Sequence, residues 1–177
     1  MMKRMFTLLL ALVVAVGFTL QAQNKYVGVK MCSMCHKADK TGNQFGVWQK
    51  SAHSQAYKTL TGAKAAEIAK AKGIKNAAEA PECLACHGAV DAKLAEKTYD
   101  VKDGVQCEIC HGPGSGYKNM AIMKDKAKAV AAGLHEFKDM AAVEALCKTC
   151  HNEKSPTHKA FKFDEMWAKI KHTVPKG

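Results

Sequence analysis

Apolar side chains recur at helical spacing in several separate stretches of the chain. Positions three or four apart share one face of a helix, so this recurrence predicts short amphipathic helices. Asp139 precedes one stretch as a candidate N-cap, and Gly73 and Gly133 follow two others as candidate stops. Residues 98–104 alone favour an extended segment, so we expect a mainly α protein with little or no β-structure. The expected helices are residues 47–60, 63–72, 90–96, 117–132, 139–146 and 164–172.

The first 23 residues have the pattern of a Sec-type signal peptide. Lys3 and Arg4 precede an apolar run over residues 6–20, and small Ala22 offers a cleavage site. The run is too short for a membrane span, although an uncleaved N-terminal anchor is an alternative. The pattern predicts export to the periplasm, with residues 24–177 forming one domain.

One five-residue pattern, Cys-x-x-Cys-His, occurs four times and uses all eight cysteines of the chain. It is the attachment signature of c-type haem, in which two thiols bond to the porphyrin and the next imidazole becomes the proximal ligand of the iron. We number the four copies motifs one to four in chain order. The cysteines are Cys32, Cys35, Cys83, Cys86, Cys107, Cys110, Cys147 and Cys150, and the histidines are His36, His87, His111 and His151.

Structural zinc and disulfide bonds are the other common uses of paired cysteines. Neither explains why a histidine follows every pair, which has a chance probability of about 10⁻⁶ for the 8 histidines of the chain. The sequence therefore predicts four covalently attached haem c groups. Because the chain has few large apolar residues, we expect short helices and loops wrapped around the haems, which form most of the core.

The net charge of +11 does not indicate nucleic-acid binding. Without Lys3 and Arg4 it is +9, and the propionates of four haems would lower it to about +1. Lysines are spread along the chain and RNA-type aromatic motifs are absent. No further stretch is apolar enough to predict an integral membrane span after signal cleavage.

The sixth ligand of each iron decides whether a haem transfers electrons or binds a small molecule. His53 and His172 lie on amphipathic stretches, and we regard both as candidate distal ligands. His135 follows a helix stop in a polar loop and is a weak candidate, and His158 has the surroundings of a loop residue.

Methionine is the other candidate for a sixth ligand. Met120 and Met123 follow motif three at helical spacing. A thioether ligand raises the potential of a haem relative to a second imidazole. Both methionines have an alternative role, which is to pack against a porphyrin or another helix.

Three segments, together with the four motifs, resemble the tetrahaem cytochrome c-554 family of nitrifying bacteria, which are multihaem c-type cytochromes. They are residues 48–53 (WQKSAH), 104–114 (GVQCEICHGPG) and 161–166 (FKFDEM). The resemblance spans essentially the whole chain after the signal peptide. It implies a mainly helical protein with closely stacked haems that carries electrons in the periplasm.

The resemblance also implies a set of distal ligands. His53 would serve the third haem and His172 the fourth, while the second haem, held by His87, would lack a strong sixth ligand. The family's distal histidine for the first haem has no counterpart in residues 119–123. Met120 or Met123 replaces it, His135 reaches that haem, or the first haem is open too.

These observations predict a periplasmic tetrahaem cytochrome that passes electrons from a redox protein donor to a redox protein acceptor. Such a carrier needs no catalytic residue, and the sequence favours it while leaving enzyme activity undecided. The alternative is a small-molecule redox enzyme, of the nitric oxide or hydroxylamine type, at a haem with an open sixth position. Motif two is its candidate site, and Glu82 and Glu108 lie near motifs in sequence only.

Overall fold

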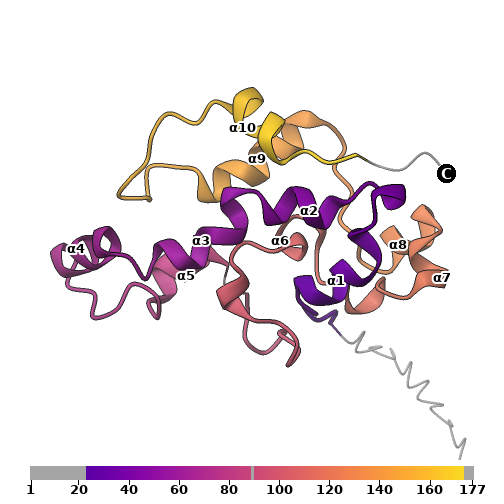
Figure 1. The fold of residues 1–177 in the computed structure, drawn as a ribbon, viewed down its shortest axis with the longest axis horizontal. Coiled ribbons are helices and arrows are strands. Elements are labelled where there is room, and N and C mark those ends of the chain that lie inside the picture. The colour runs from indigo at the N-terminus through magenta and orange to yellow at the C-terminus, as the bar shows by residue number, and fades with distance from the viewer. Residues whose placement is uncertain (1–22, 89, 174–177) are drawn as a thin grey trace, which may run out of the picture.

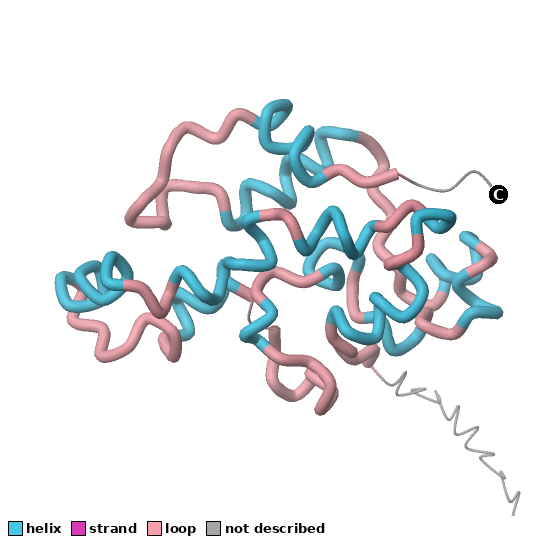
Figure 2. The backbone as a smooth tube through the Cα atoms, in the orientation of Figure 1, coloured by secondary structure: helices cyan, strands magenta, loops and turns pink. Residues whose placement is uncertain are grey.

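The computed structural model describes residues 23–88 and 90–173 of the chain, so residues 1–22 of the predicted signal peptide lie outside the described residues (Figure 1). Short helices joined by loops make up this part of the chain, and the longest, α9, has 11 residues. It contains no strand, only an isolated parallel bridge between Tyr26 and Ala95 (Figure 2). The prediction of a mainly α fold is therefore confirmed.

The helical elements follow one another along the chain, with η marking 3₁₀ turns. They are α1 (Val29–His36), η1 (Asp39–Thr41), α2 (Gln44–Gln49), η2 (Ala52–Gln55), α3 (Ala56–Thr59), α4 (Ala63–Ala71), α5 (Pro81–His87), η3 (Val101–Asp103), α6 (Cys107–His111), η4 (Gly114–Gly116), α7 (Met120–Met123), α8 (Lys126–Ala131), α9 (Met140–Cys150) and α10 (Phe163–Ile170).

Three helix boundaries lie where the sequence predicts them. The Asp139 side chain accepts a hydrogen bond from Ala142 N at 2.8 Å and caps α9. Gly73 and Gly133 follow α4 and α8 with φ angles of 70° and 106°. These values lie in the left-handed region, which only glycine enters at low cost, so each glycine ends its helix.

The prediction of a helix over residues 90–96 is wrong. This segment forms a turn and then pairs with the start of the described chain. Tyr26 N donates to Leu94 O at 2.7 Å, and Glu96 N donates to Tyr26 O at 2.8 Å. Pairing with a distant segment satisfies backbone groups that a helix would satisfy internally, and a local pattern does not reveal it.

Two other expectations need correction. Residues 98–104 hold the 3₁₀ turn η3 in place of an extended segment, because the Asp100 side chain accepts from Lys102 N at 2.9 Å and caps the turn. The single helix expected over residues 117–132 is divided into α7 and α8. Asp125 divides them, since its side chain accepts from Lys128 N at 3.1 Å and starts a new helix.

The apolar core of the polypeptide is small and rich in alanine. One cluster joins Leu60, Ala69 and Ala77, with Leu84 of α5 packed against it. So few large buried side chains bury little apolar area for a chain of this length. The buried apolar residues are Val27, Val29, Leu60, Ala69, Ala77, Ala80, Tyr117, Ala129 and Val143.

Candidate haem-binding site

Each Cys-x-x-Cys-His motif lies on a helix, and motifs one and three lie against each other. Motif one is on α1 and motif three is on α6. Helices α1 and α6 contact each other, and the interaction between the side chains of Cys32 and Cys107 raises the pKa of Cys32 and lowers that of Cys107. The structure thus brings together two attachment sites that lie far apart in sequence.

Motifs two and four form the second pair. Burial and then the nearby Cys150 raise the pKa of the Cys86 thiol, and helices α5 and α9 contact each other. Burial raises the pKa of Cys110 to about 11, with Cys147 of motif four as the next cause. Contacts of α1 with α6 and of α5 with α9, together with the proximity of Cys147 to Cys110, place the motifs in the order one, three, four, two.

The proximal imidazoles of motifs one and two are oriented by hydrogen bonds to Nδ1. His87 Nδ1 lies 2.7 Å from the carbonyl oxygen of Ala56. His36 Nδ1 lies 3.2 Å from Gln44 Oε1. A carbonyl oxygen only accepts, so the proton is on Nδ1 and the lone pair of Nε2 is free for a metal. This arrangement is common for metal-binding histidines.

The other two proximal histidines each face a histidine from a distant part of the chain. The ring centres of His53 and His151 are 6.1 Å apart, and those of His111 and His172 are 5.8 Å apart. Two imidazoles on opposite sides of one metal, each with a metal–nitrogen distance of about 2.0–2.1 Å, have ring centres about 6 Å apart. The residues present therefore fit haem irons with two imidazole ligands.

The ring distances favour a different pairing from the one that the family resemblance implies. His53 faces motif four and His172 faces motif three, the reverse of the expected order. The local sequence shows that both histidines are available, but the long-range packing of α9 and of the chain after α10 decides which iron each one reaches.

Burial keeps these imidazoles neutral. It lowers the pKa of His111 to about 4, with the imidazoles of His172 and His36 acting in the same direction. Burial also lowers the pKa of His53, and His151 contributes to the shift. Only a neutral imidazole has a lone pair for iron, so the environment favours the form that binds metal.

A bracket of backbone and indole contacts positions His53. Trp48 Nε1 donates to Val105 O at 2.7 Å, and Val105 N donates to His53 O at 2.9 Å. Gly104 has a φ of 76°, and a Cβ there would clash with the carbonyl oxygen of His53. The Trp-x₄-His element thus fixes the η2 turn against the segment that leads into motif three.

His172 lies beyond α10, which ends at Ile170, and not within the helix expected over residues 164–172. Its neighbour Thr173 accepts a hydrogen bond from Gln44 Nε2 at 3.0 Å. Since Gln44 also contacts the His36 ring, one side chain connects the described end of the chain to motif one.

The remaining candidates lie at the surface. His135 Nδ1 is 3.2 Å from the carbonyl oxygen of Cys110, so its Nε2 is free, and its backbone N donates to His111 O at 2.9 Å. Met120 is 64% exposed, and Met123 is partly buried. His158 is exposed in the loop between α9 and α10. No ring contact pairs His135 or His158 with a proximal histidine among the described residues.

Comparisons with known proteins found sequences similar to this chain. The family model described as cytochrome c554 and c-prime matches residues 31–112, which contain motifs one to three. A relative named cytochrome c-554, from Nitrosomonas europaea, is 29% identical over 88% of this chain and 77% of its own length. No solved structure matches the chain significantly.

The chain is thus similar to the cytochrome c-554 family over most of its length. These matches support a c-type cytochrome with covalently bound haem c that carries electrons. In the described part of the chain no helix is long and apolar enough to cross a membrane.

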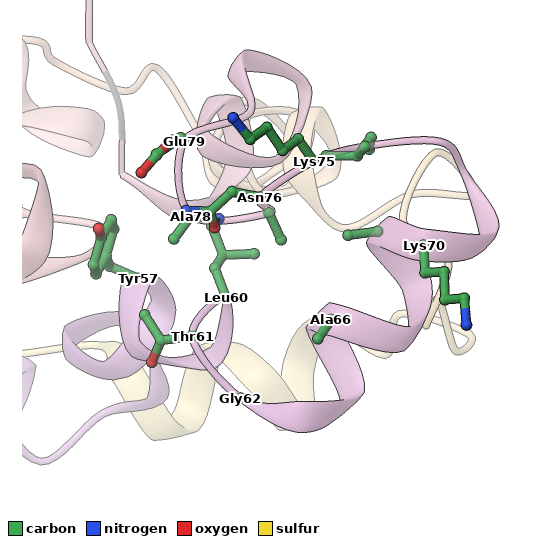
Figure 3. A pocket seen from close by; sticks show the side chains of 13 residues that line it. Tyr57, Leu60, Thr61, Gly62, Ala66, Lys70, Lys75, Asn76, Ala78 and Glu79 are labelled. Carbon is green, nitrogen blue, oxygen red and sulfur yellow. Dashed lines mark hydrogen bonds between the residues drawn. The ribbon is translucent and has the colours of Figure 1, made fainter.

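A cavity of about 590 Å³ lies beside motif two (Figure 3). Leu60 forms its floor, while Tyr57, Asn76 and Glu79 carry polar groups around it. The floor belongs to the apolar cluster against which Cys83 packs. A polar cavity and an attachment cysteine therefore share one set of apolar neighbours.

Sequence reasoning missed the role of Glu108. It is 1% exposed, and its carboxylate accepts hydrogen bonds from Val27 N at 2.8 Å, Gly28 N at 2.7 Å and Gly114 N at 2.6 Å. Gln106 is buried beside it. The signal available was an acidic residue between the two cysteines of a motif, but its partners come from another segment.

Proposed function

We propose that this chain is a periplasmic tetrahaem electron carrier, in which residues 1–23 are the signal peptide and residues 24–177 the cytochrome domain. The observation that carries the proposal is the pair of imidazole–imidazole spacings, 6.1 Å for His53 with His151 and 5.8 Å for His111 with His172. An iron with two imidazole ligands has no vacant position and supplies one-electron transfer.

Each of the four proposed haem sites has its own set of attachment cysteines and histidine ligands. The eight motif cysteines anchor the porphyrins, and His36, His87, His111 and His151 bind the irons from one side. His53 completes the site of motif four, and His172 completes that of motif three. Motifs one and three, three and four, and four and two are neighbours, so electrons would pass in the order one, three, four, two between two redox protein partners.

Motif one has three candidates for its second ligand, namely His135, Met120 and Met123. His135 has its Nδ1 held by a carbonyl oxygen and its Nε2 free, as His87 does. Among the three, this geometry favours His135.

The mass and reductive titration of the exported protein test the proposal. We expect the mass of a chain that begins near residue 24 and carries four haems, and four one-electron steps that reverse on reoxidation. A mass with fewer than four haems would contradict the proposal of a tetrahaem protein. Irreversible reduction would contradict the proposal of an electron carrier.

A small-molecule redox enzyme is the second candidate, and the surroundings of motif two favour it. No ring contact pairs His87 with a second imidazole among the described residues, and the cavity lies beside this motif. Tyr57 lines that cavity and is the polar hydroxyl nearest in sequence to Ala56, which holds His87.

Steady-state consumption of nitric oxide or hydroxylamine by the reduced protein tests this candidate. Turnover that falls in Tyr57→Phe supports it. A stoichiometric reaction that stops after one equivalent excludes it and leaves electron transfer as the function.

A further inference from the structure

The carboxylate of Glu108 is a buried charge with no counter-ion in the described part of the chain. Both of its oxygens accept from backbone N–H groups, which is the pattern of an ionised, acceptor-only carboxylate. The lysine ion pairs recorded for residues 23–88 and 90–173 all involve other acids. The backbone N–H groups stabilise the negative charge of Glu108 but do not neutralise it.

The carboxylate of Glu108 lies close to both motif one and motif three. Glu108 follows Cys107 directly and lies within one helical turn of His111. Its partners Val27 and Gly28 immediately precede α1, which carries motif one. A charge on α6 that is bonded to the start of α1 is close to both attachment sites.

The effect of the charge on its surroundings is visible at two tyrosines. Burial, and second the charge of Glu108, raise the pKa of Tyr99 and of Tyr117. The hydroxyl proton of Tyr117 is shared between the carbonyl oxygens of Gly112 and His111, which lie 2.6 and 3.1 Å from the hydroxyl oxygen. The field of the carboxylate therefore extends to groups that contact the end of motif three.

No other motif has an acid at this position. The residues that follow the first cysteine in motifs one, two and four are Ser33, Leu84 and Lys148. Lys148 is exposed and pairs with Glu144 at 2.6 Å. Motif three is thus the one whose haem would be next to a buried negative charge.

We propose that Glu108 is an electrostatic tuning residue, which lowers the reduction potential of the haem bound by motif three and, to a smaller extent, that of motif one. Oxidised haem iron carries one more positive charge than reduced iron, so a nearby anion stabilises the oxidised form. The inference rests on the proposed function, since it requires haem at both motifs.

The size of the effect follows from Coulomb's law. At an effective dielectric constant of about 20, a unit charge one to two helical turns away changes an equilibrium at least about tenfold. Removing the charge should therefore lower the ratio of oxidised to reduced haem about tenfold at a fixed solution potential, which for one electron is a rise of about 59 mV.

The test is a potentiometric titration of the haem-loaded protein in three variants. Glu108→Gln removes the charge and keeps the size of the side chain. Gly114→Ala keeps the charge but disturbs its hydrogen bonds, because a Cβ there would lie 2.9 Å from Glu108 Oε1. Glu82→Gln is the matched control, as Glu82 is an exposed acid that adjoins the first cysteine of motif two.

In Glu108→Gln we expect the midpoint potential of one or two of the one-electron steps to rise. In the other two variants, the ratio of oxidised to reduced haem at a fixed solution potential should stay within twofold of wild type at every step. Unchanged steps in Glu108→Gln would overturn the proposal. A tenfold change in Gly114→Ala would also overturn it, because geometry and not charge would then set the potential, and this outcome can be read even where Glu108→Gln does not fold. Loss of haem from wild-type protein would instead contradict the proposed function.

Discussion

Replacing His53 by alanine tests the assignment of distal ligands. The imidazole of His53 is centred 6.1 Å from that of His151, the spacing expected for two ligands of one metal. The bracket that holds this segment uses the indole of Trp48 and the backbone of Val105 and His53, so alanine leaves it intact. His53→Ala should therefore open one iron site without displacing the η2 turn.

The expected magnitude is one haem per chain. Carbon monoxide binds reduced haem only where the sixth position is open or easily vacated. In a carbon monoxide difference spectrum of the dithionite-reduced protein, the number of responding haems should rise by one in His53→Ala. His172→Ala should give the same increase, and the double variant should gain two, because the two imidazoles face different motifs.

His158→Ala is the matched control. His158 is exposed in a loop, so its removal should leave the number of responding haems unchanged. If His53→Ala and His158→Ala both match wild type, His53 is not a ligand and the geometric argument is wrong. An increase in His158→Ala would show that the distal ligand of motif four comes from the loop before α10.

Three further changes give distinct results. Trp48→Phe leaves the carbonyl of Val105 without its indole donor, so we expect a loss of about 1–3 kcal/mol in the free energy of unfolding by denaturant, whereas Trp48→Phe at wild-type stability would refute the bracket. Tyr117→Phe removes the hydrogen bonds to Gly112 and His111 and should cost about 1 kcal/mol in the same assay, and no loss would mean that these bonds contribute nothing. Burial, and second the imidazole of His36, lower the pKa of His172, so acid protonates His172 only below the ordinary value of 6.5. The low-spin absorption spectrum should therefore persist as the pH falls to 6.5. Loss of this spectrum above pH 6.5 would contradict the assignment of His172 as a ligand.

The sequence was sufficient for features that depend on neighbouring residues. The four motifs predicted haem c from the residue types alone, and the cytochrome c-554 family match supports this cofactor. Asp139, Gly73 and Gly133 marked helix boundaries correctly because capping is a local interaction. The mainly helical fold followed from apolar spacing for the same reason.

Features that depend on distant segments could not be derived. Residues 90–96 have a helical pattern, yet they pair with Tyr26 and form a turn. The proximal histidines that His53 and His172 meet differ from those that the resemblance implies, because the packing of α9 decides which ring each one approaches. The role of Glu108 depends on Val27 and Gly28, about eighty residues earlier in the chain, and a sequence pattern does not show that contact.

A carbon monoxide difference spectrum of the reduced wild-type protein, titrated to count responding haems, tests the central claim most directly. In the proposed function, His53 and His172 would close two irons, motif two would be open, and the ligand of motif one would decide the remaining site. The account therefore predicts that one or two haems respond. A response from three or four would contradict the two imidazole pairs, and a response from none would contradict the open position at motif two.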